Sequence, residues 1–212
     1  MIKAISRPLA QLKTEYTVVV IGSGYGAGVA ASRMARAGQS VCLLERGREL
    51  LPGQYPNDLA SASAQMQADT SGGRIGSPYA MFNVHVNPDM MALVGCGLGG
   101  TSLINANVAL EMDPRLFTYK PRQWPKEFRD DPDALKAHVE QARSMLDAKA
   151  YPSTFPALGK LQALESSAKV MKQPFYRPPI CVNFEDKVNP FGVPQVACTL
   201  CGDCCSGCND GA

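Results

Sequence analysis

Histidine is scarce in this 212-residue chain, which has only two, and no hydrophobic run is long enough to cross a membrane. An excess of charge of one sign is also missing, because 21 basic residues against 19 acidic ones leave a net charge of +2. Proteins that bind nucleic acids or membrane surfaces gather a basic excess on one face, so neither class is favoured. The first residues lack the apolar stretch and cleavage site of a secretory signal, which predicts a cytoplasmic protein without membrane spans.

The composition is that of a globular protein, with 45% hydrophobic and 19% charged residues. The length allows one domain, or one domain and part of another. The eight cysteines do not resemble the spread-out framework of a small disulfide-rich secreted protein, because five of them lie between residues 198 and 208. Clustering of this kind indicates metal ligation or redox chemistry.

Residues 16–45 have the pattern of a βαβ unit. Residues 16–21 form a β-branched run, typical of a strand that is buried on both faces of a parallel sheet. Glycines follow at once, residues 27–37 favour a helix, and residues 40–44 form a second apolar strand.

The glycine turn of this unit carries a dinucleotide-binding pattern. Gly22, Gly24 and Ala27 fit G-x-G-x-x-G/A between the first strand and the helix. The first glycine allows the tight turn, the second lets the backbone approach a pyrophosphate, and the small third residue lets helix and strand pack closely. Glu45 ends the second strand, where a carboxylate accepts hydrogen bonds from a ribose and disfavours the 2′-phosphate of NADP. A glycine turn that merely packs is the alternative, and the motif alone does not separate FAD from NAD.

The fold class predicted from these features is α/β, with a Rossmann-like FAD/NAD(P)-binding domain of three layers around a mostly parallel sheet. The domain is expected to be incomplete and to carry helical and irregular insertions. Further elements are predicted as helices over 57–68, 131–146 and 156–171 and as short strands over 90–94 and 180–184. Asp131 is the expected N-cap of the second of these helices, with Pro132 at its first position.

A second glycine-rich stretch runs from Gly95 to Ser102, with four glycines in six residues. Such a stretch lets main chain lie against a flat or anionic ligand, and Thr101 and Ser102 could cap a helix that follows. An unrelated tight turn is the alternative.

The sequence here resembles the glucose-methanol-choline oxidoreductase family, in its cholesterol-oxidase-like branch. Residues 18–38 look like the first FAD segment, 43–47 like the ribose-binding strand end and 94–110 like the second flavin segment, and the resemblance extends to 113–117 and the cysteine-rich end. It implies bound FAD along Gly22, Ser23, Gly24, Tyr25, Gly26, Glu45, Arg46, Gly95, Gly97, Gly100, Thr101, Ser102, Asn105, Ala106, Asn107 and Val108. Cys96 departs from the pattern, where Arg or another polar residue is expected.

The resemblance implies a flavoenzyme that removes a hydride from the CH–OH group of a small-molecule alcohol, such as a sterol, and passes the electrons to oxygen or to an acceptor protein. Members of the family are much longer and carry their catalytic base near the C-terminus. Neither His85 nor His138 matches that position, so no catalytic residue is assigned. We therefore expect an N-terminal portion, with residues 1–112 in the FAD-binding domain and 113–212 as a helical and Cys-rich segment leading to a substrate domain.

The cysteine cluster is the least decided feature. Cys198, Cys201, Cys204 and Cys208 have the spacing C-x2-C-x2-C-x3-C, which occurs in bacterial ferredoxins and predicts an iron–sulfur cluster. Zinc fits less well, because its paired ligands usually lie a dozen or more residues apart. Another metal, a disulfide and free structural thiols stay open. Of the other cysteines, Cys42 is expected in the core and Cys181 is undecided.

The sequence also bears on two other functions. A non-catalytic flavin-binding or electron-transfer module with an iron–sulfur cluster agrees with the missing base. An NAD-dependent short-chain dehydrogenase does not agree with the sequence, because no tyrosine is followed by lysine four residues later.

Overall fold

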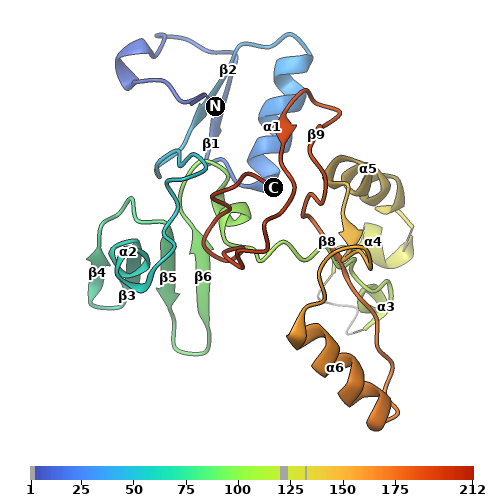
Figure 1. Cartoon of the computed structure of the whole chain (residues 1–212). Helices are drawn as coiled ribbons and strands as arrows, with labels where there is room; N and C mark the ends of the chain where they lie inside the picture. The colour runs from blue at the N-terminus through green and yellow to red at the C-terminus, as the bar shows by residue number, and fades with distance from the viewer. Residues whose placement is uncertain (1–2, 120–123, 132) are drawn as a thin grey trace. The chain divides into compact units, whose positions relative to one another are not determined.

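The computed structural model describes residues 3–119, 124–131 and 133–212 (Figure 1). The chain divides into two compact units. The first consists of Met1–Asn107 and Glu185–Ala212, and the second of Val108–Phe184. The domain boundary expected at residue 112 stays a prediction.

The βαβ unit predicted near the N-terminus is present. Strand β1 (Val18–Ile21), helix α1 (Tyr25–Arg36) and strand β2 (Val41–Leu44) follow one another, after a short 3-10 helix, η1 (Leu9–Gln11). The two strands are parallel, in a register that pairs Val18 with Val41 and Ile21 with Leu44. Figure 1 shows α1 beside this pair, and it packs against both strands.

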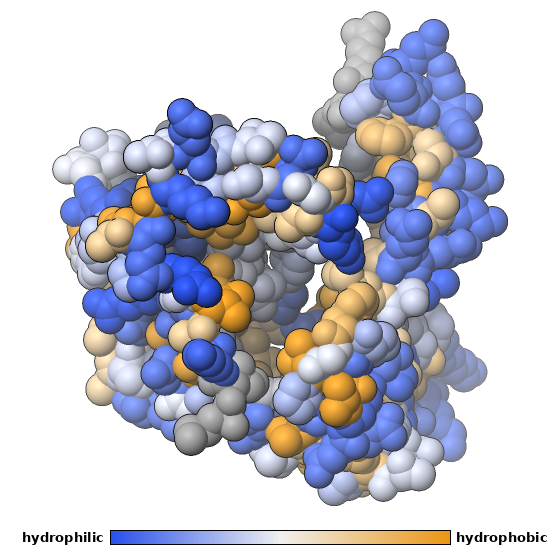
Figure 2. Space-filling view, turned by 90° about the horizontal axis from the view of Figure 1, so that it is seen from above, coloured by the Kyte–Doolittle hydropathy of each residue, from blue (hydrophilic) through white to orange (hydrophobic). Residues whose placement is uncertain are grey.

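The expected burial of the first strand on both faces is wrong for this structure. Val19 is 54% exposed and Ile21 85% exposed, while Val18 and Val20 are half-buried. Within the described residues β1 pairs only with β2, so the face that carries Val19 and Ile21 has no covering layer. Parallel strands are normally covered on both faces, which explains the apolar sequence of a strand that is half-open here. Apolar side chains are visible at the surface in Figure 2.

A four-stranded sheet follows in the first unit. Its strands are β3 (Met66–Thr70), β4 (Gly73–Gly76), β5 (Phe82–Val86) and β6 (Met91–Gly95), in the order β4-β3-β5-β6. Only β3 and β5 are parallel, whereas the β3–β4 and β5–β6 pairs are antiparallel. The fold is therefore mixed α/β, and the prediction of a mostly parallel sheet does not hold for this sheet.

The helix predicted over 57–68 is shorter in the structure. Helix α2 (Leu59–Ala64) begins after Asp58, whose side chain accepts hydrogen bonds from the Ala60 and Ser61 amides at 2.8 and 2.9 Å. This capping box fixes the start of the helix. The helix ends early because Met66 already belongs to β3, which pairs with β4 and β5.

Buried side chains of the first unit gather where β5 begins and β6 ends. Ala80, Met81 and Cys96 are buried there, and the amide of Cys96 donates to the carbonyl of Met81 at 2.8 Å. Gln67 is 2% exposed and donates from Nε2 to the Ala80 carbonyl at 2.6 Å, which satisfies this buried amide group. Cys42 is buried, as the sequence predicts.

The second unit is mostly helical. It contains α3 (Arg115–Thr118), α4 (Lys126–Asp130), α5 (Lys136–Leu146), β7 (Lys149–Ala150), α6 (Gly159–Val170) and β8 (Pro179–Ile180). Strand β8 is shorter than the strand predicted over 180–184. Three aromatic rings, Tyr151, Phe155 and Phe184, pack edge to face in this unit. No helix in the described ranges is long and apolar enough to span a bilayer.

The N-terminus predicted for the helix over 131–146 is wrong. Helix α5 begins at Lys136 with Leu135 as its N-cap, whereas Asp131 lies before it in a turn. The Asp131 carboxylate accepts the Asp133 amide at 3.1 Å, and its carbonyl accepts the Ala134 amide, so Asp131 stabilises a turn instead of the helix. Pro132 lies outside the described residues.

Candidate functional site

The first glycine loop joins β1 to α1. Gly22 has a φ of +87°, a left-handed conformation that favours glycine, and its amide donates to the Leu44 carbonyl of β2 at 2.7 Å. Helix α1 begins after Gly24, and no side chain caps it within the described residues. The first N–H groups of a helix lack acceptors within the helix and carry the positive end of its dipole. The start of α1 can therefore bind an anionic group.

Gly24 is a glycine that the backbone itself does not require. Its φ of −62° and ψ of −178° are an extended conformation that any residue adopts. Among the described residues, no atom beyond Gly24 and its two chain neighbours would lie within 4 Å of a Cβ built on Gly24. The same open space surrounds Gly26 and Gly28 in the first turn of α1. The small residues at the start of α1 thus leave room on the side where their Cβ atoms would stand.

The carboxylate at the end of β2 is held beside this loop. Ser23 donates from its hydroxyl to Oε2 of Glu45 at 2.5 Å, and the Gly47 amide donates to Oε1 at 2.8 Å. The predicted pairing of the glycine loop with an acid at the strand end is therefore present, 22 residues apart in sequence. Arg46, which follows the acid, points to a different place, with Nη1 3.5 Å from the Oε1 atom of Gln67 in β3.

The second glycine loop lies directly against the first. A Cβ on Gly100 would be 2.9 Å from Cα of Gly24, and a Cβ on Gly47 would be 2.3 Å from the amide nitrogen of Gly97. Within the second loop, a Cβ on Gly95 would be 2.4 Å from the Gly100 carbonyl oxygen. Main chain therefore packs against main chain at these positions. The glycines there are required by the fold, which distinguishes them from Gly24.

The helix that Thr101 and Ser102 were expected to cap is a short 3-10 helix, η2 (Gly100–Leu103), and both residues lie inside it. Its N-cap is Gly99, and no side chain caps it. The capping prediction is wrong because these hydroxyls bond to the loop itself. Thr101 Oγ1 accepts the Gly95 amide at 3.2 Å, and Ser102 Oγ donates to the Gly99 carbonyl at 2.8 Å.

The segment after η2 is strained and returns to α1. Ala106 and Asn107 both have a φ of 59°, a left-handed conformation that costs free energy for residues other than glycine. The side chain of Asn105 accepts the Asn107 amide at 2.8 Å and donates to the hydroxyl of Tyr25 in α1. The structure thus brings together two of the predicted site residues, Tyr25 and Asn105. Val108 belongs to the second unit, where it forms a bridge with Ile180.

Cys96, where a polar residue is expected, is part of the core. Its side chain is buried, and Sγ lies 3.7 Å from the carbonyl oxygen of Pro78. A small apolar residue suits this position because it faces the loop before β5 and not the open space at α1.

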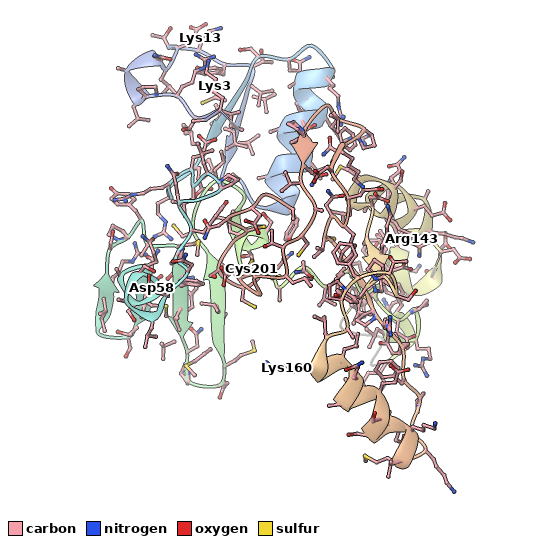
Figure 3. All side chains as sticks on the ribbon, in the orientation of Figure 1. Lys3, Lys13, Asp58, Arg143, Lys160 and Cys201 are labelled. Atoms are coloured by element: carbon pink, nitrogen blue, oxygen red, sulfur yellow. The ribbon has the colours of Figure 1, made fainter. Side chains whose placement is uncertain are left out.

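The cysteine-rich segment does not form the predicted metal site. All eight cysteines are free, and within the described residues no three Cys, His, Asp or Glu side chains come together in a group that could hold a metal ion. Cys201 is exposed on the C-terminal coil (Figure 3), as are Cys204 and Cys205. The spacing along the chain is therefore suitable, but the side chains do not converge for Cys198, Cys201, Cys204 and Cys208. The electron-transfer function that rested on an iron–sulfur cluster loses its basis.

The C-terminal segment is instead attached to the loop after β2. Asn209 accepts the amides of Gly53 and Tyr55 through Oδ1, both at 2.9 Å, and donates from Nδ2 to the Tyr55 carbonyl at 3.1 Å. Gly207 lies against the Tyr55 ring so closely that a Cβ there would be 2.1 Å from a ring carbon. Burial and the nearby Cys208 thiol raise the pKa of Tyr55. Nothing in the sequence pattern singled out Asn209 for this role.

We expect Asn209→Ala to release the C-terminal segment from this loop. The variant removes three hydrogen bonds and leaves the exposed Gly53 amide and the partly buried Tyr55 amide without their acceptor, which should cost about 1–3 kcal/mol locally. Amide hydrogen exchange at Gly53 and Tyr55 should accelerate by about tenfold or more. Asn189→Ala is a matched control, because Asn189 accepts two amides in the separate turn between β9 (Lys187–Val188) and β10 (Pro194–Gln195). Unchanged exchange at Gly53 and Tyr55 would show that Asn209 does not hold the loop.

The two histidines belong to elements other than the two glycine loops. His85 is on β5, with Nδ1 3.4 Å from Asp69 Oδ2 and Nε2 3.1 Å from the Asn83 side-chain nitrogen. His138 is exposed on α5 in the second unit. Both nitrogens of His85 face neighbours on its own sheet, so the structure gives His85 a structural setting.

The chain is similar to bacterial cholesterol oxidase. It is 28% identical to the cholesterol oxidase of Mycobacterium tuberculosis, strains CDC 1551 / Oshkosh and ATCC 25618 / H37Rv, over 214 residues. The match covers 95% of this chain and 36% of the oxidase, so the chain spans about a third of the length of these relatives. No family model matches the chain.

Proposed function

We propose that this chain binds FAD across its two glycine loops and that the whole protein is a flavin-dependent oxidoreductase of the glucose-methanol-choline type, which oxidises the CH–OH group of an alcohol. The observation that carries the proposal is Gly24. Its backbone conformation and the open space at its Cβ position give no reason for glycine among the described residues, while a ligand pyrophosphate beside the α1 terminus would require it.

The residues around Gly24 fit an adenine dinucleotide. The start of α1 supplies free N–H groups and the positive end of a helix dipole for phosphates. The Glu45 carboxylate is held nearby and keeps acceptor capacity on both oxygens for ribose hydroxyls. Its negative charge disfavours a 2′-phosphate. The second glycine loop lies against Gly24 and so extends the backbone surface along which the rest of the ligand would lie.

The reaction type is taken from the similarity to cholesterol oxidase. FAD, when bound, accepts a hydride from the alcohol carbon. The residues of this chain would bind and orient the cofactor, with Glu45 at the ribose and with the strained turn at Ala106 and Asn107, which follows η2 in the sequence. A sterol is the substrate class that the relatives' name suggests, and oxygen or a protein would accept the electrons.

The activity is tested by mixing the purified flavin-loaded protein with cholesterol or with a short-chain primary alcohol, without oxygen. Loss of the visible absorption of oxidised flavin with one equivalent of the sterol, together with formation of the ketone, is the expected result. Reduction by the short alcohol alone would keep the reaction type and reject the sterol. No reduction by any alcohol would reject the reaction.

We expect Glu45→Gln to weaken FAD binding by about 1–2 kcal/mol, or roughly 5- to 30-fold, because the neutral amide forms weaker hydrogen bonds to ribose. The measurement is a fluorescence titration with FAD. Glu49→Gln is the matched control, because the Glu49 carboxylate accepts the Ile5 and Ser6 amides of the N-terminal segment and none of the described residues of the glycine loops. An affinity within about twofold of the native value would mean that Glu45 does not reach the ribose.

A further inference from the structure

Ser23 lies at the centre of the three segments that form the candidate site. Its side chain is buried, with 8% of the residue exposed, between the first glycine loop, the end of β2 and the second glycine loop. Its hydroxyl donates to Glu45 at 2.5 Å and accepts the Gly99 amide at 2.9 Å. The Gly97 carbonyl oxygen lies 3.1 Å from the same atom and is a second acceptor for its single proton. The single proton of this hydroxyl and one of its two acceptor positions are therefore used inside the protein.

We propose that Ser23 is a positioning residue that sets the ligand preference of the site through Glu45, without touching the ligand itself. The inference rests on the proposed binding of an adenine dinucleotide. It assigns to Ser23 a role different from that of the neighbouring glycines, which leave space for the ligand. Ser23 holds the carboxylate that recognises the ribose and ties it to the second glycine loop.

The geometry around Glu45 supports this role. One carboxylate oxygen is held by Ser23 and the other by the Gly47 amide, so the carboxylate cannot rotate without breaking one of these hydrogen bonds. The contact to Ser23 has the short length of a hydrogen bond to a charged acceptor, which is among the stronger kinds. Loss of the Ser23 hydroxyl would leave Glu45 with the Gly47 amide alone and would remove the acceptor of the Gly99 amide.

The orientation of the Glu45 carboxylate determines how strongly the site favours a ligand with ribose hydroxyls. A ligand with both ribose hydroxyls can use a carboxylate that is already oriented, whereas a ligand without them gains nothing from it. Removing Ser23 should therefore weaken the binding of the first ligand much more than that of the second. A purely structural role would weaken the binding of both ligands equally.

The test uses ADP and 2′,3′-dideoxyadenosine 5′-diphosphate as probes, each competing with FAD for the native protein, Ser23→Ala and the control Ser63→Ala. Ser63 also donates to a main-chain carbonyl, that of Leu59 at 2.7 Å, but it lies in α2 away from the glycine loops. We expect the native protein and Ser63→Ala to prefer ADP by about tenfold, which corresponds to one charge-assisted hydrogen bond. In Ser23→Ala the preference should fall to about twofold or less.

The dependence on Glu45 gives a second readout. In a Glu45→Gln background, Ser23→Ala should change the ADP preference by less than about twofold, because the group through which Ser23 acts has been altered. Amide hydrogen exchange at Gly47 and Gly99 should accelerate in Ser23→Ala by about tenfold or more, whether or not a ligand is present.

The possible failures are distinguishable. If the native protein shows the ADP preference and Ser23→Ala retains it, the role of Ser23 is overturned and the proposed cofactor site stands. If the folded native protein binds neither FAD nor ADP, both the proposed function and the ligand preference assigned to Ser23 are overturned. Equal weakening of both probes in Ser23→Ala would reduce Ser23 to a structural residue and would also overturn the inference.

Discussion

Replacing Gly47 with alanine should destabilise the first unit by about 3 kcal/mol or prevent its folding. The new Cβ would lie 2.3 Å from the Gly97 amide nitrogen, 2.5 Å from Gly97 Cα and 2.7 Å from the Cys96 carbonyl carbon. All three are main-chain atoms, so no side chain can move aside, and the second glycine loop would have to separate from the end of β2. The measurement is the midpoint of urea or thermal unfolding.

The control for Gly47→Ala is Gly28→Ala in α1, where a Cβ would meet no protein atom within 4 Å. Alanine favours a helix over glycine, so Gly28→Ala should raise the free energy of unfolding by about 0.5–1 kcal/mol. Both substitutions replace glycine with alanine. Changes of opposite sign in the free energy of unfolding would therefore come from the surroundings of the two positions alone. A Gly47→Ala variant as stable as the native protein would show that the two loops do not pack as described.

Replacing Gly24 with valine should act in the opposite way to Gly47→Ala. FAD affinity should fall strongly, and stability should fall little. The backbone at Gly24 suits any residue and its surroundings are open, so the unfolding free energy should change by about 1 kcal/mol or less. The branched side chain would occupy the space of the pyrophosphate, and FAD affinity should fall by about 100-fold or more, equivalent to about 2.7 kcal/mol.

Ala30→Val is the control for Gly24→Val, because Ala30 is exposed in the same helix and lies beyond its first turn. Valine there should leave FAD affinity unchanged and lower stability by a few tenths of a kcal/mol through its weaker helix propensity. Equal FAD affinity of Gly24→Val and the native protein would remove the main support for a ligand at this loop.

The local βαβ unit could be predicted from the sequence because its signals are short-range. A β-branched run, a glycine turn and a helical segment follow directly on one another, and Gly22, Gly24 and Glu45 lie where the motif requires them. The sequence did not predict that β3 pairs with both β4 and β5. All three strands are short, and β3 begins within the segment 57–68, whose composition favours a helix.

The contacts within the site needed the structure. Gly47 and Gly97 are 50 residues apart in the sequence, and only the fold shows that they touch. The cysteine spacing predicted a metal site by local pattern, but a metal site also requires the side chains to converge, which spacing alone does not ensure. Asn209 carries no motif and bonds to a loop more than 150 residues away.

The central claim is that the open space beside Gly24 belongs to the pyrophosphate of a bound dinucleotide. It is tested most directly by titrating FAD into the purified native protein and into Gly24→Val, after both have been shown to unfold with similar midpoints. We predict saturable binding of one FAD per native chain and an affinity at least about 100-fold lower in Gly24→Val. Absence of binding by the folded native protein, or equal binding by both proteins, would contradict the claim.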